Sequence, residues 1–193
     1  MVQRSAGVVI PLRSFTHAKA RLASALSDDA RISLARSMAD RVADAAGDRP
    51  TVVVTSAPEV VAWAAARSIA TIDDPGTLDA AADTGRAWVK SQGLARVVIT
   101  HADLPYATSL DGVAGDGDNA VAVVVPDHRD DGTPVLALPV DAPFNFSYGP
   151  GSAARHITEA ARCGLEVRVV RDDALAFDVD IEADLRTLES RRP

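Results

Sequence analysis

The chain of 193 residues contains one cysteine, Cys163, and few aromatic residues. A single cysteine excludes an intrachain disulfide framework and a metal site built from cysteines alone. Cys163 lies in an apolar helical pattern, which predicts a buried structural thiol rather than a nucleophile. No apolar run approaches the ~18 residues needed to cross a bilayer, and the N-terminus lacks a long apolar segment. We therefore expect a soluble, cytoplasmic protein with no membrane partner.

The chain also lacks a surplus of basic residues, since its net charge is −7 and its pI is about 5.0. Proteins that bind nucleic acids normally carry such a surplus, so we expect no nucleic-acid partner. A negative net charge still permits a local cationic pocket for a small anion. Hydrophobic residues make up 47% of the chain. This composition and length predict a single domain, residues 1–193, with a sizeable core.

Several common functional motifs are absent. The four histidines show no HxH or HExxH spacing, which disfavours a zinc site. The chain has no GxSxG, GxxxxGK[ST] or GxGxxG motif. An esterase elbow, a Walker loop and the dinucleotide fingerprint are therefore unsupported.

Strands and helices are predicted to alternate along the first half of the chain. Short β-branched runs predict strands, and apolar residues at helical spacing predict helices. The predicted strands are 8–12, 51–56, 70–72 and 96–101, and the helices between them are 30–46, 59–67 and 77–92. This order predicts a mostly parallel sheet with helices on both faces.

The second half has a different pattern. We expect a polar loop over 107–119 that contains a short helix at 109–113. Further strands are predicted at 121–125, 135–140 and 166–171, and helices at 152–163 and 181–191. The whole chain is therefore predicted to be α/β, a Rossmann-like three-layer sandwich around a mostly parallel central sheet.

The stretch from Gly7 to Leu22, GVVIPLRSFTHAKARL, combines a buried strand with three cations. Arg13, Lys19 and Arg21 follow the strand, and open α/β sheets bind ligands beyond the carboxyl ends of their strands. A loop there can close on an anion, and polyphosphate best explains three cations. A solvated basic turn is the alternative interpretation.

Carboxylates follow two other apolar segments. Asp103 comes directly after the predicted strand 96–101, and Asp178 and Asp180 precede the last helix on one face of an extended segment. Magnesium usually takes one or two carboxylates together with substrate phosphates. Asp103 and the second pair could therefore share a metal if they meet. Alternatively, Asp103 caps the following turn and Asp180 caps the last helix.

The turn Tyr148-Gly-Pro-Gly-Ser152 precedes a predicted helix. N–H groups at a helix start, close approach at the glycines and the Ser152 hydroxyl make a candidate anion site. Arg155 and His156 are expected to add donors nearby. The alternative is an ordinary glycine turn with Ser152 as the N-cap.

Five colinear segments together resemble the phospholactate/phosphoenolpyruvate guanylyltransferase family of coenzyme F-420 biosynthesis, a branch of the molybdenum-cofactor-type nucleotidyltransferases. They are IPLRSFTHAKARL, HADLP, VVVPDHRDDGT, YGPGSAARHITEA and LAFDVDIEADL. The resemblance runs from about residue 7 to 189. It implies a nucleotidyltransferase fold and GMP transfer from GTP to 2-phospholactate or phosphoenolpyruvate, with release of pyrophosphate. It also implies Mg²⁺ as the cofactor, and a homodimer is a further expectation.

The resemblance also implies roles for individual residues. The catalytic residues would be Lys19, Arg21 and Asp103, and magnesium would bind Asp103 and Asp180. The nucleotide would contact Pro11, Leu12, Arg13, Lys19, Arg21, Leu78 and Asp79. The acceptor would contact Thr133, Gly149 and Ser152.

Two departures from the family pattern leave the base and the acceptor open. Asp79 stands where typical members have Asn, although a carboxylate can accept from guanine N1–H and N2–H₂. Pro134 stands where Asn or Thr is usual, which removes a backbone N–H donor. The alternatives are a nucleotidyltransferase of the same fold with another base or acceptor, such as a sugar phosphate or cofactor precursor, or an inactive nucleotide-binding module. The presence of both Asp103 and Asp180 argues against an inactive module.

Overall fold

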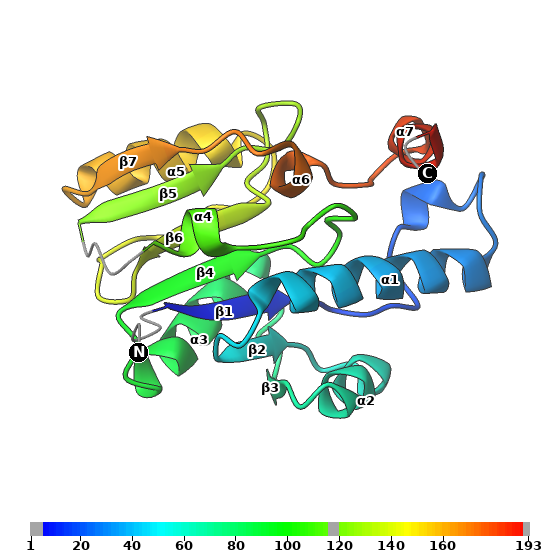
Figure 1. The fold of residues 1–193 in the computed structure, drawn as a ribbon, viewed down its shortest axis with the longest axis horizontal. Helices are drawn as coiled ribbons and strands as arrows, with labels where there is room; N and C mark the ends of the chain where they lie inside the picture. Colours follow the sequence, from blue (N-terminus) through cyan, green and yellow to red (C-terminus); the bar gives the residue numbers. More distant parts are fainter. Residues whose placement is uncertain (1–5, 116–119, 191–193) are drawn as a thin grey trace.

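The computed structural model describes residues 6–115 and 120–190, and their strands form one seven-stranded sheet (Figure 1). The strands are β1 (Ala6–Pro11), β2 (Thr51–Val54), β3 (Ala70–Ile72), β4 (Arg96–Thr100), β5 (Val121–Val125), β6 (Val135–Pro139) and β7 (Glu166–Val169). Their order across the sheet is β3-β2-β1-β4-β6-β5-β7. Only the pairs that include β6 are antiparallel within the described sheet. The expected mostly parallel sheet is therefore confirmed.

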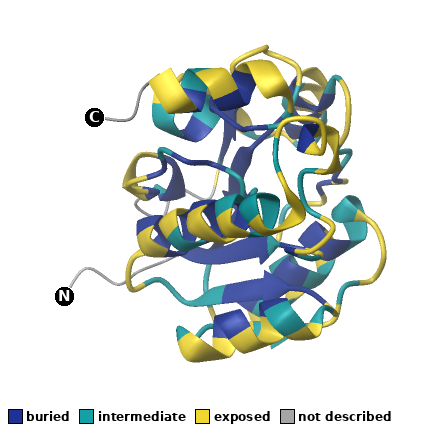
Figure 2. Cartoon of the chain, turned by 90° about the vertical axis from the view of Figure 1, so that its right-hand side faces the viewer, coloured by how far each residue is buried: buried dark blue, intermediate teal, exposed yellow. Residues whose placement is uncertain are grey.

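Helices cover both faces of this sheet, which confirms the expected layers (Figure 1). One face packs against α1 (Asp28–Ala46), α2 (Pro58–Ala66) and α4 (Asp111–Ala114), and the other against α3 (Leu78–Ser91) and α5 (Ser152–Arg162). Side chains alternate along each strand, so Val8 and Ile10 face α1 while Val9 faces α3. Figure 2 shows the resulting pattern of buried strands between helices with exposed outer surfaces.

Capping residues and one glycine set the helix ends and their packing. Ser27 Oγ accepts the N–H of Ala30 at 3.3 Å and starts α1. Thr77 Oγ1 accepts the N–H of Ala80 at 3.2 Å and starts α3. Gly85 allows α3 to lie directly on β1, because a Cβ at this position would lie 2.2 Å from Val9 Cγ1.

A small apolar cluster joins the loop after β1 to the C-terminal helix α7 (Glu182–Ser190). It contains Leu22 from the short 3₁₀ helix η1 (Ala20–Leu22), Met38 from α1, and Phe177, Val179, Leu185 and Leu188. Figure 1 shows α7 beside this loop, at the end of the molecule towards which β1 and β4 run. The loop after β1 and the C-terminal helix α7 therefore build one rim of the structure.

Some local predictions were wrong. The short helix expected at 109–113 is found one to two residues later, as α4. The stretch 107–115 is more buried than a polar loop, since Leu110 and Val113 are buried and the Leu110 N–H donates to Ala45 O at 3.1 Å. Residues 116–119 of the predicted loop lie outside the described residues. The structure also has a helical turn, α6 (Asp173–Ala176), that was not predicted, because four residues are too few to establish a helical period.

Cys163 is half-buried rather than buried. Its thiol donates a hydrogen bond to Pro143 O at 3.2 Å, and burial raises the pKa of the thiol. A raised pKa keeps the thiol protonated, which fits a structural residue better than a nucleophile. No helix in the described part of the chain combines the length and apolar character required to cross a membrane.

Candidate active site

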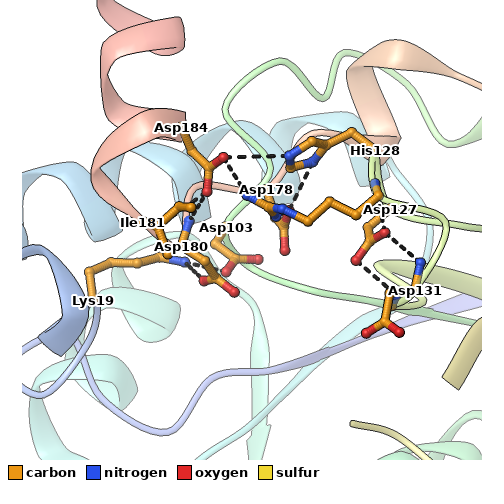
Figure 3. Close-up of polar contacts among 11 residues, drawn as sticks. Lys19, Asp103, Asp127, His128, Asp131, Asp178, Asp180, Ile181 and Asp184 are labelled. Carbon is orange, nitrogen blue, oxygen red and sulfur yellow. Dashed lines mark hydrogen bonds and ion pairs between the residues drawn. The ribbon is translucent and has the colours of Figure 1, made fainter. Parts of the chain in front are cut away.

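Lys19 lies at the centre of a charged cluster on the rim. The residue immediately precedes η1, has a left-handed backbone with φ of 57°, and its side chain is only 8% exposed. Its Nζ contacts Asp103 Oδ2 and lies 3.0 Å from Asp180 Oδ1 (Figure 3). Two carboxylates from distant parts of the chain therefore converge on one ammonium. We refer to Lys19, Asp103, Asp178 and Asp180 as the Lys19 cluster.

The electrostatics of this cluster favour the charged forms of Lys19 and Asp103. Burial disfavours the charged form of Lys19, but Asp103 and Asp180 outweigh burial and raise its pKa. Burial likewise opposes ionisation of Asp103, but Lys19 and His101 outweigh it and lower the pKa of Asp103. Lys19 and Asp103 therefore form an ion pair at neutral pH.

The hydrogen-bonding capacity of the carboxylates is incompletely used. Asp103 Oδ1 is buried and has no hydrogen-bond partner among the described residues, and Asp178 Oδ1 also makes no hydrogen bond there. A buried polar atom without a partner is rare and costly. Burial, together with repulsion from Asp103 and Asp180, raises the pKa of Asp178 to about 6. Asp178 Oδ1 already lies 3.3 Å from His128 Nδ1 and 3.7 Å from Arg129 Nη1, so Asp103 Oδ1 is the oxygen available to a further cation.

These contacts bear on the alternatives considered for both aspartates. Asp103 and Asp180 direct carboxylate oxygens at Lys19, and neither is bonded to a turn or helix amide in the described structure. The interpretation of either residue as a simple cap is therefore unsupported. Within the described residues, no three His, Cys, Asp or Glu side chains are arranged as a metal site. Two carboxylates completed by substrate phosphates are nevertheless a usual magnesium environment.

Two adjoining cavities open beside Lys19. One, of about 270 Å³, is lined by Leu12, Ala18, Lys19, Ala35, His101, Ala102 and Asp103, and the other, of about 460 Å³, by Val54, Asp74, Gly76, Thr77 and Ala81. Both cavities share Pro11, Arg13 and Leu78. Arg13 forms part of the wall, since its Nε lies 3.0 Å from Asp74 Oδ2 and its Nη2 donates to Gly76 O. The cavities lie at the carboxyl ends of β1 and β4, where such sheets bind ligands.

A larger hollow of about 760 Å³ lies at the amino ends of β2 and β3. Its two arginines already have acidic partners: Arg49 pairs with Asp111, and Arg67 pairs with Asp40 and Asp44. The hollow also lies away from the carboxyl ends of the strands, where open α/β sheets bind ligands. The cavities beside the Lys19 cluster are therefore a better candidate for the active site than this hollow.

Two expected nucleotide residues do not line these cavities. Arg21 is exposed on η1 and forms no ion pair with a described residue. Asp79 accepts the N–H of Tyr148 through Oδ1 at 2.7 Å, which ties α3 to the turn before α5. The structure therefore gathers Pro11, Leu12, Arg13, Lys19 and Leu78 around the cavities, without Arg21 and Asp79.

Thr133 and Ser152 meet in a buried hydrogen-bond network with His156. Thr133 Oγ1 lies 3.0 Å from Ser152 Oγ and 3.0 Å from His156 Nδ1. The Ser147 N–H donates to His156 Nε2 at 3.0 Å, so Nδ1 carries the ring proton and donates to Thr133. Burial lowers the pKa of His156 to about 4, so the ring is neutral. We refer to these residues as the His156 network; its two hydroxyls share one hydrogen bond, so one hydroxyl proton remains available.

The turn before α5 is already bonded, contrary to the expectation of free donors. Gly151, with φ of 74°, is the N-cap, so Ser152 is the first helical residue instead of the cap. Asp131 accepts the N–H of Gly151 at 2.9 Å and, through its backbone oxygen, that of Ala153 at 3.0 Å. Gly149, with φ of 101°, lies in the same turn. These bonds leave fewer amides for an anion than the sequence predicts.

The expectation that Arg155 and His156 supply extra donors was also wrong. Arg155 donates to the backbone oxygens of Ser147 and Tyr148 at 2.9 and 3.2 Å and so braces the turn. Both ring nitrogens of His156 are engaged inside the protein. The roles of Thr133, Gly149 and Ser152 in acceptor binding stay a prediction.

A second charged group, which was not predicted from the sequence, lies beside Asp180. His128 and Arg129, from the loop between β5 and β6, lie against Asp178 and Asp184 (Figure 3). The sequence signal for this group was Asp184, an acidic residue in the first turn of the last helix. Such a carboxylate typically bonds the N–H groups at the helix start.

Known proteins resemble this chain over nearly its full length. The profile of the family described as guanylyl transferase CofC like matches residues 6–189. A phosphoenolpyruvate guanylyltransferase of Sphaerobacter thermophilus is 34% identical over 193 residues, which cover 96% of this chain and 93% of that protein. One of Rubrobacter xylanophilus is 35% identical, covering 94% and 92%. A 2-phospho-L-lactate guanylyltransferase of Methanothermobacter thermautotrophicus is 31% identical, covering 92% and 81%.

A solved structure agrees on the fold. A protein of Desulfovibrio desulfuricans G20, described as a nucleotide-diphospho-sugar transferase, superposes with a TM-score of 0.79. The match covers 96% of this chain and 87% of that one, at 16% sequence identity. The expected nucleotidyltransferase fold is therefore confirmed.

Proposed function

Because this chain belongs to the guanylyl transferase CofC-like family, it is a nucleotidyltransferase, and we propose that it transfers GMP from GTP to phosphoenolpyruvate. The products are pyrophosphate and a guanylylated three-carbon acid. The choice of acceptor follows the names of the relatives at 34% and 35% identity. The observation that carries the proposal is the convergence of Asp103 and Asp180 on Lys19, beside two cavities at the carboxyl ends of the strands.

In this proposal the nucleotide occupies the two cavities. Pro11, Leu12, Arg13 and Leu78 form its walls, and Lys19 and Arg21 neutralise the triphosphate. Arg21 is exposed and can turn towards an anion that enters from solvent. Asp79 uses Oδ1 for Tyr148, so its second oxygen is the one proposed to accept from guanine.

Magnesium fits the donor set of the Lys19 cluster. Asp103 and Asp180 supply hard oxygen ligands, and Asp103 Oδ1 has no hydrogen-bond partner among the described residues. When bound, the ion neutralises charge that develops on the transferred phosphoryl group. Asp103 and Asp180 would hold the ion, and Lys19, which lies between them, would contact the triphosphate.

The chain's own residues mainly position two anions. The phosphate of the acceptor is already ionised, so its attack on the α-phosphorus needs no strong base. Thr133 and Ser152, which keep one hydroxyl proton available, are proposed to orient the acceptor with Gly149. Holding two reactants in line accounts for much of the acceleration in phosphoryl transfer. A role in coenzyme F-420 biosynthesis, a cytoplasmic location and a homodimer stay predictions.

The proposal can be tested by measuring pyrophosphate release. The purified protein is incubated with each of four nucleoside triphosphates and with phosphoenolpyruvate, 2-phospholactate or 3-phosphoglycerate, with and without Mg²⁺. We expect release with GTP and phosphoenolpyruvate that stops when the metal is chelated. Release with another nucleotide or acid would correct the substrate, and no release with any pair would overturn the proposal.

A further inference from the structure

The loop between β5 and β6 is held from within by Asp127. Asp127 Oδ1 accepts the N–H groups of Arg129 and Asp131 at 3.0 and 2.9 Å, and Oδ2 accepts that of Gly132 at 2.8 Å (Figure 3). A Cβ at Gly132 would lie 2.6 Å from Asp127 Oδ2, so the turn closes tightly on the carboxylate. These bonds fix the backbone from which Arg129 projects.

Arg129 reaches from this loop to α7. Its Nη2 lies 2.5 Å from Asp184 Oδ1, and the neighbouring His128 Nε2 lies 3.4 Å from the same oxygen. The Asp184 side chain is only 5% exposed. Burial opposes its ionisation, but the hydrogen bond and charge of Arg129, together with the N–H groups of Asp180 and Ile181, outweigh burial and lower the pKa of Asp184. A buried, ionised carboxylate is therefore held between two elements of the chain.

The other oxygen of Asp184 holds the backbone that presents Asp180. Asp184 Oδ2 accepts the N–H of Asp180 at 2.9 Å and that of Ile181 at 3.0 Å. The Asp180 side chain meanwhile points to Lys19 (Figure 3). A continuous chain of contacts thus runs from the β5–β6 loop, through Arg129 and Asp184, to the carboxylate proposed to bind magnesium.

We propose that Arg129 and Asp184 are positioning residues for Asp180: Arg129 fixes Asp184, and Asp184 fixes the backbone from which the Asp180 carboxylate projects. This inference rests on the proposed function, in which Asp180 binds magnesium. A carboxylate that only capped α7 could remain exposed and needs no partner from another element. The burial of Asp184 and its ion pair with Arg129 point to a role beyond the cap.

The same loop also reaches the opposite side of the site. Asp131 holds Gly151 at the start of α5, and the loop continues to Thr133 in the His156 network. Arg129 and Asp131 therefore connect the proposed metal carboxylate and the proposed acceptor residues to one turn. Displacement of Asp180 would raise the Mg²⁺ concentration needed for activity. It would leave the cavity walls in place, because they belong to other segments.

The decisive variant is Arg129→Met, which removes the charge but keeps an unbranched side chain. Asp184 then loses its ion-pair partner, and its hold on the Asp180 backbone weakens. We expect the Mg²⁺ concentration for half-maximal activity to rise by about tenfold, since partners of metal ligands typically contribute 10–100-fold to affinity or activity. The KM for GTP at saturating Mg²⁺ should change less than twofold, and Arg129→Lys should recover part of the metal affinity.

A second measurement does not depend on turnover. Binding of Mn²⁺ to the protein with a GTP analogue that carries a methylene between its α- and β-phosphorus is followed by electron paramagnetic resonance. Arg129→Met should weaken this binding by about tenfold, as should Asp184→Asn. The matched control is Arg171→Met, which removes an exposed ion pair with Asp130 on the same loop and should leave Mn²⁺ binding unchanged.

The outcomes separate this inference from the proposed function. If the wild-type protein shows no Mg²⁺-dependent guanylyl transfer, the proposed function fails. If the wild-type protein is active but Arg129→Met only lowers the melting temperature, with an unchanged Mg²⁺ requirement and unchanged Mn²⁺ affinity, the pair is merely structural and the inference is wrong. A matching loss of metal affinity in Arg171→Met would also overturn it.

Discussion

The Lys19 cluster and the His156 network are both connected to the β5–β6 loop, but they satisfy buried polar groups in different ways. The Lys19 cluster is charged and leaves carboxylate oxygens without hydrogen bonds among the described residues. The His156 network is neutral, and both nitrogens of its histidine have partners. Burial is costly for charges unless they are paired, but costs little for neutral groups that bond to one another. The Lys19 cluster is therefore suited to exchanging its ionic partners, and the His156 network is suited to holding a fixed geometry.

The largest effect is expected from Asp103→Asn, which removes one charge from the Lys19 cluster. Asp103 is a proposed magnesium ligand, and a bound metal ion supplies several kcal/mol of charge stabilisation, so the variant should lose roughly 10³-fold in guanylyl transfer. Its melting temperature should stay close to that of the wild-type protein, since Lys19 keeps Asp180 as a partner. Steady-state kinetics and thermal unfolding are the measurements. Asp141→Asn, in an exposed pair with Lys90, is the control.

The next effect concerns the free energy of unfolding at low pH, to which the His156 network and the Lys19 cluster contribute in opposite directions. The pKa of His156 falls to about 4 in the folded protein, against about 6.5 unfolded, so the unfolded state binds the proton first. Stability should therefore fall as the pH drops from 6.5 to 4, by up to about 3 kcal/mol. Asp178, with its pKa raised to about 6, gives the opposite slope between about pH 4 and 6.

Denaturant unfolding between pH 4 and 7 tests this comparison. In the wild-type protein the two slopes partly cancel between about pH 4 and 6. His156→Gln should reduce the loss of stability on acidification, and Asp178→Asn should increase it. Identical pH profiles for the wild-type protein and His156→Gln would show that the network tolerates a charged histidine.

A smaller effect, of about 2 kcal/mol, is expected from Lys19→Met. GTP binding should weaken by about 10- to 100-fold, because a hydrogen bond to a charged group contributes roughly 1.5–3 kcal/mol. The variant should also bind Mn²⁺ more tightly without nucleotide, since the ammonium no longer occupies both carboxylates. Titration calorimetry measures both affinities, with the exposed Lys90→Met as the control. Weaker Mn²⁺ binding would instead show that Lys19 supports the metal site.

The smallest effect is expected in the His156 network. Ser152→Ala should raise the acceptor KM by about tenfold and leave GTP binding nearly unchanged, because it removes one hydroxyl from a site that keeps Thr133. Thr158→Ser, on the exposed face of the same helix, is the control. Pro134→Asn should change the preference among the three acids. Equal loss of GTP binding and acceptor use in Ser152→Ala would assign this turn to the nucleotide.

Much of the fold could be predicted because its signals are local. The β-branched run of β2 and the helical spacing of apolar residues in α1 are such signals, and both elements lie where they were expected. The buried stretch around Leu110 was missed because two large apolar residues among glycines and aspartates give no period. The turn α6 was too short to be recognised.

The site was predicted less completely, since residue types do not tell which donors are already used. Lys19, Asp103 and Asp180 were expected on one rim, and the structure brings them together. The amide of Gly151 and the ring of His156 also looked available, but Asp131 and Thr133 occupy them. Such pairings depend on how distant segments pack, which the spacing along the chain does not reveal.

The close packing of Gly85 on Val9 has an evolutionary consequence. A methyl group at position 85 would collide with Val9 and push α3 away from the sheet. Leu78, about two turns away on the same helix, lines both cavities, so this displacement would deepen the space for the nucleotide. Relatives with alanine at this position should therefore carry a smaller residue where this chain has Val9. Such paired exchanges could tune nucleotide selectivity through helix spacing, without replacing any residue that touches the ligand.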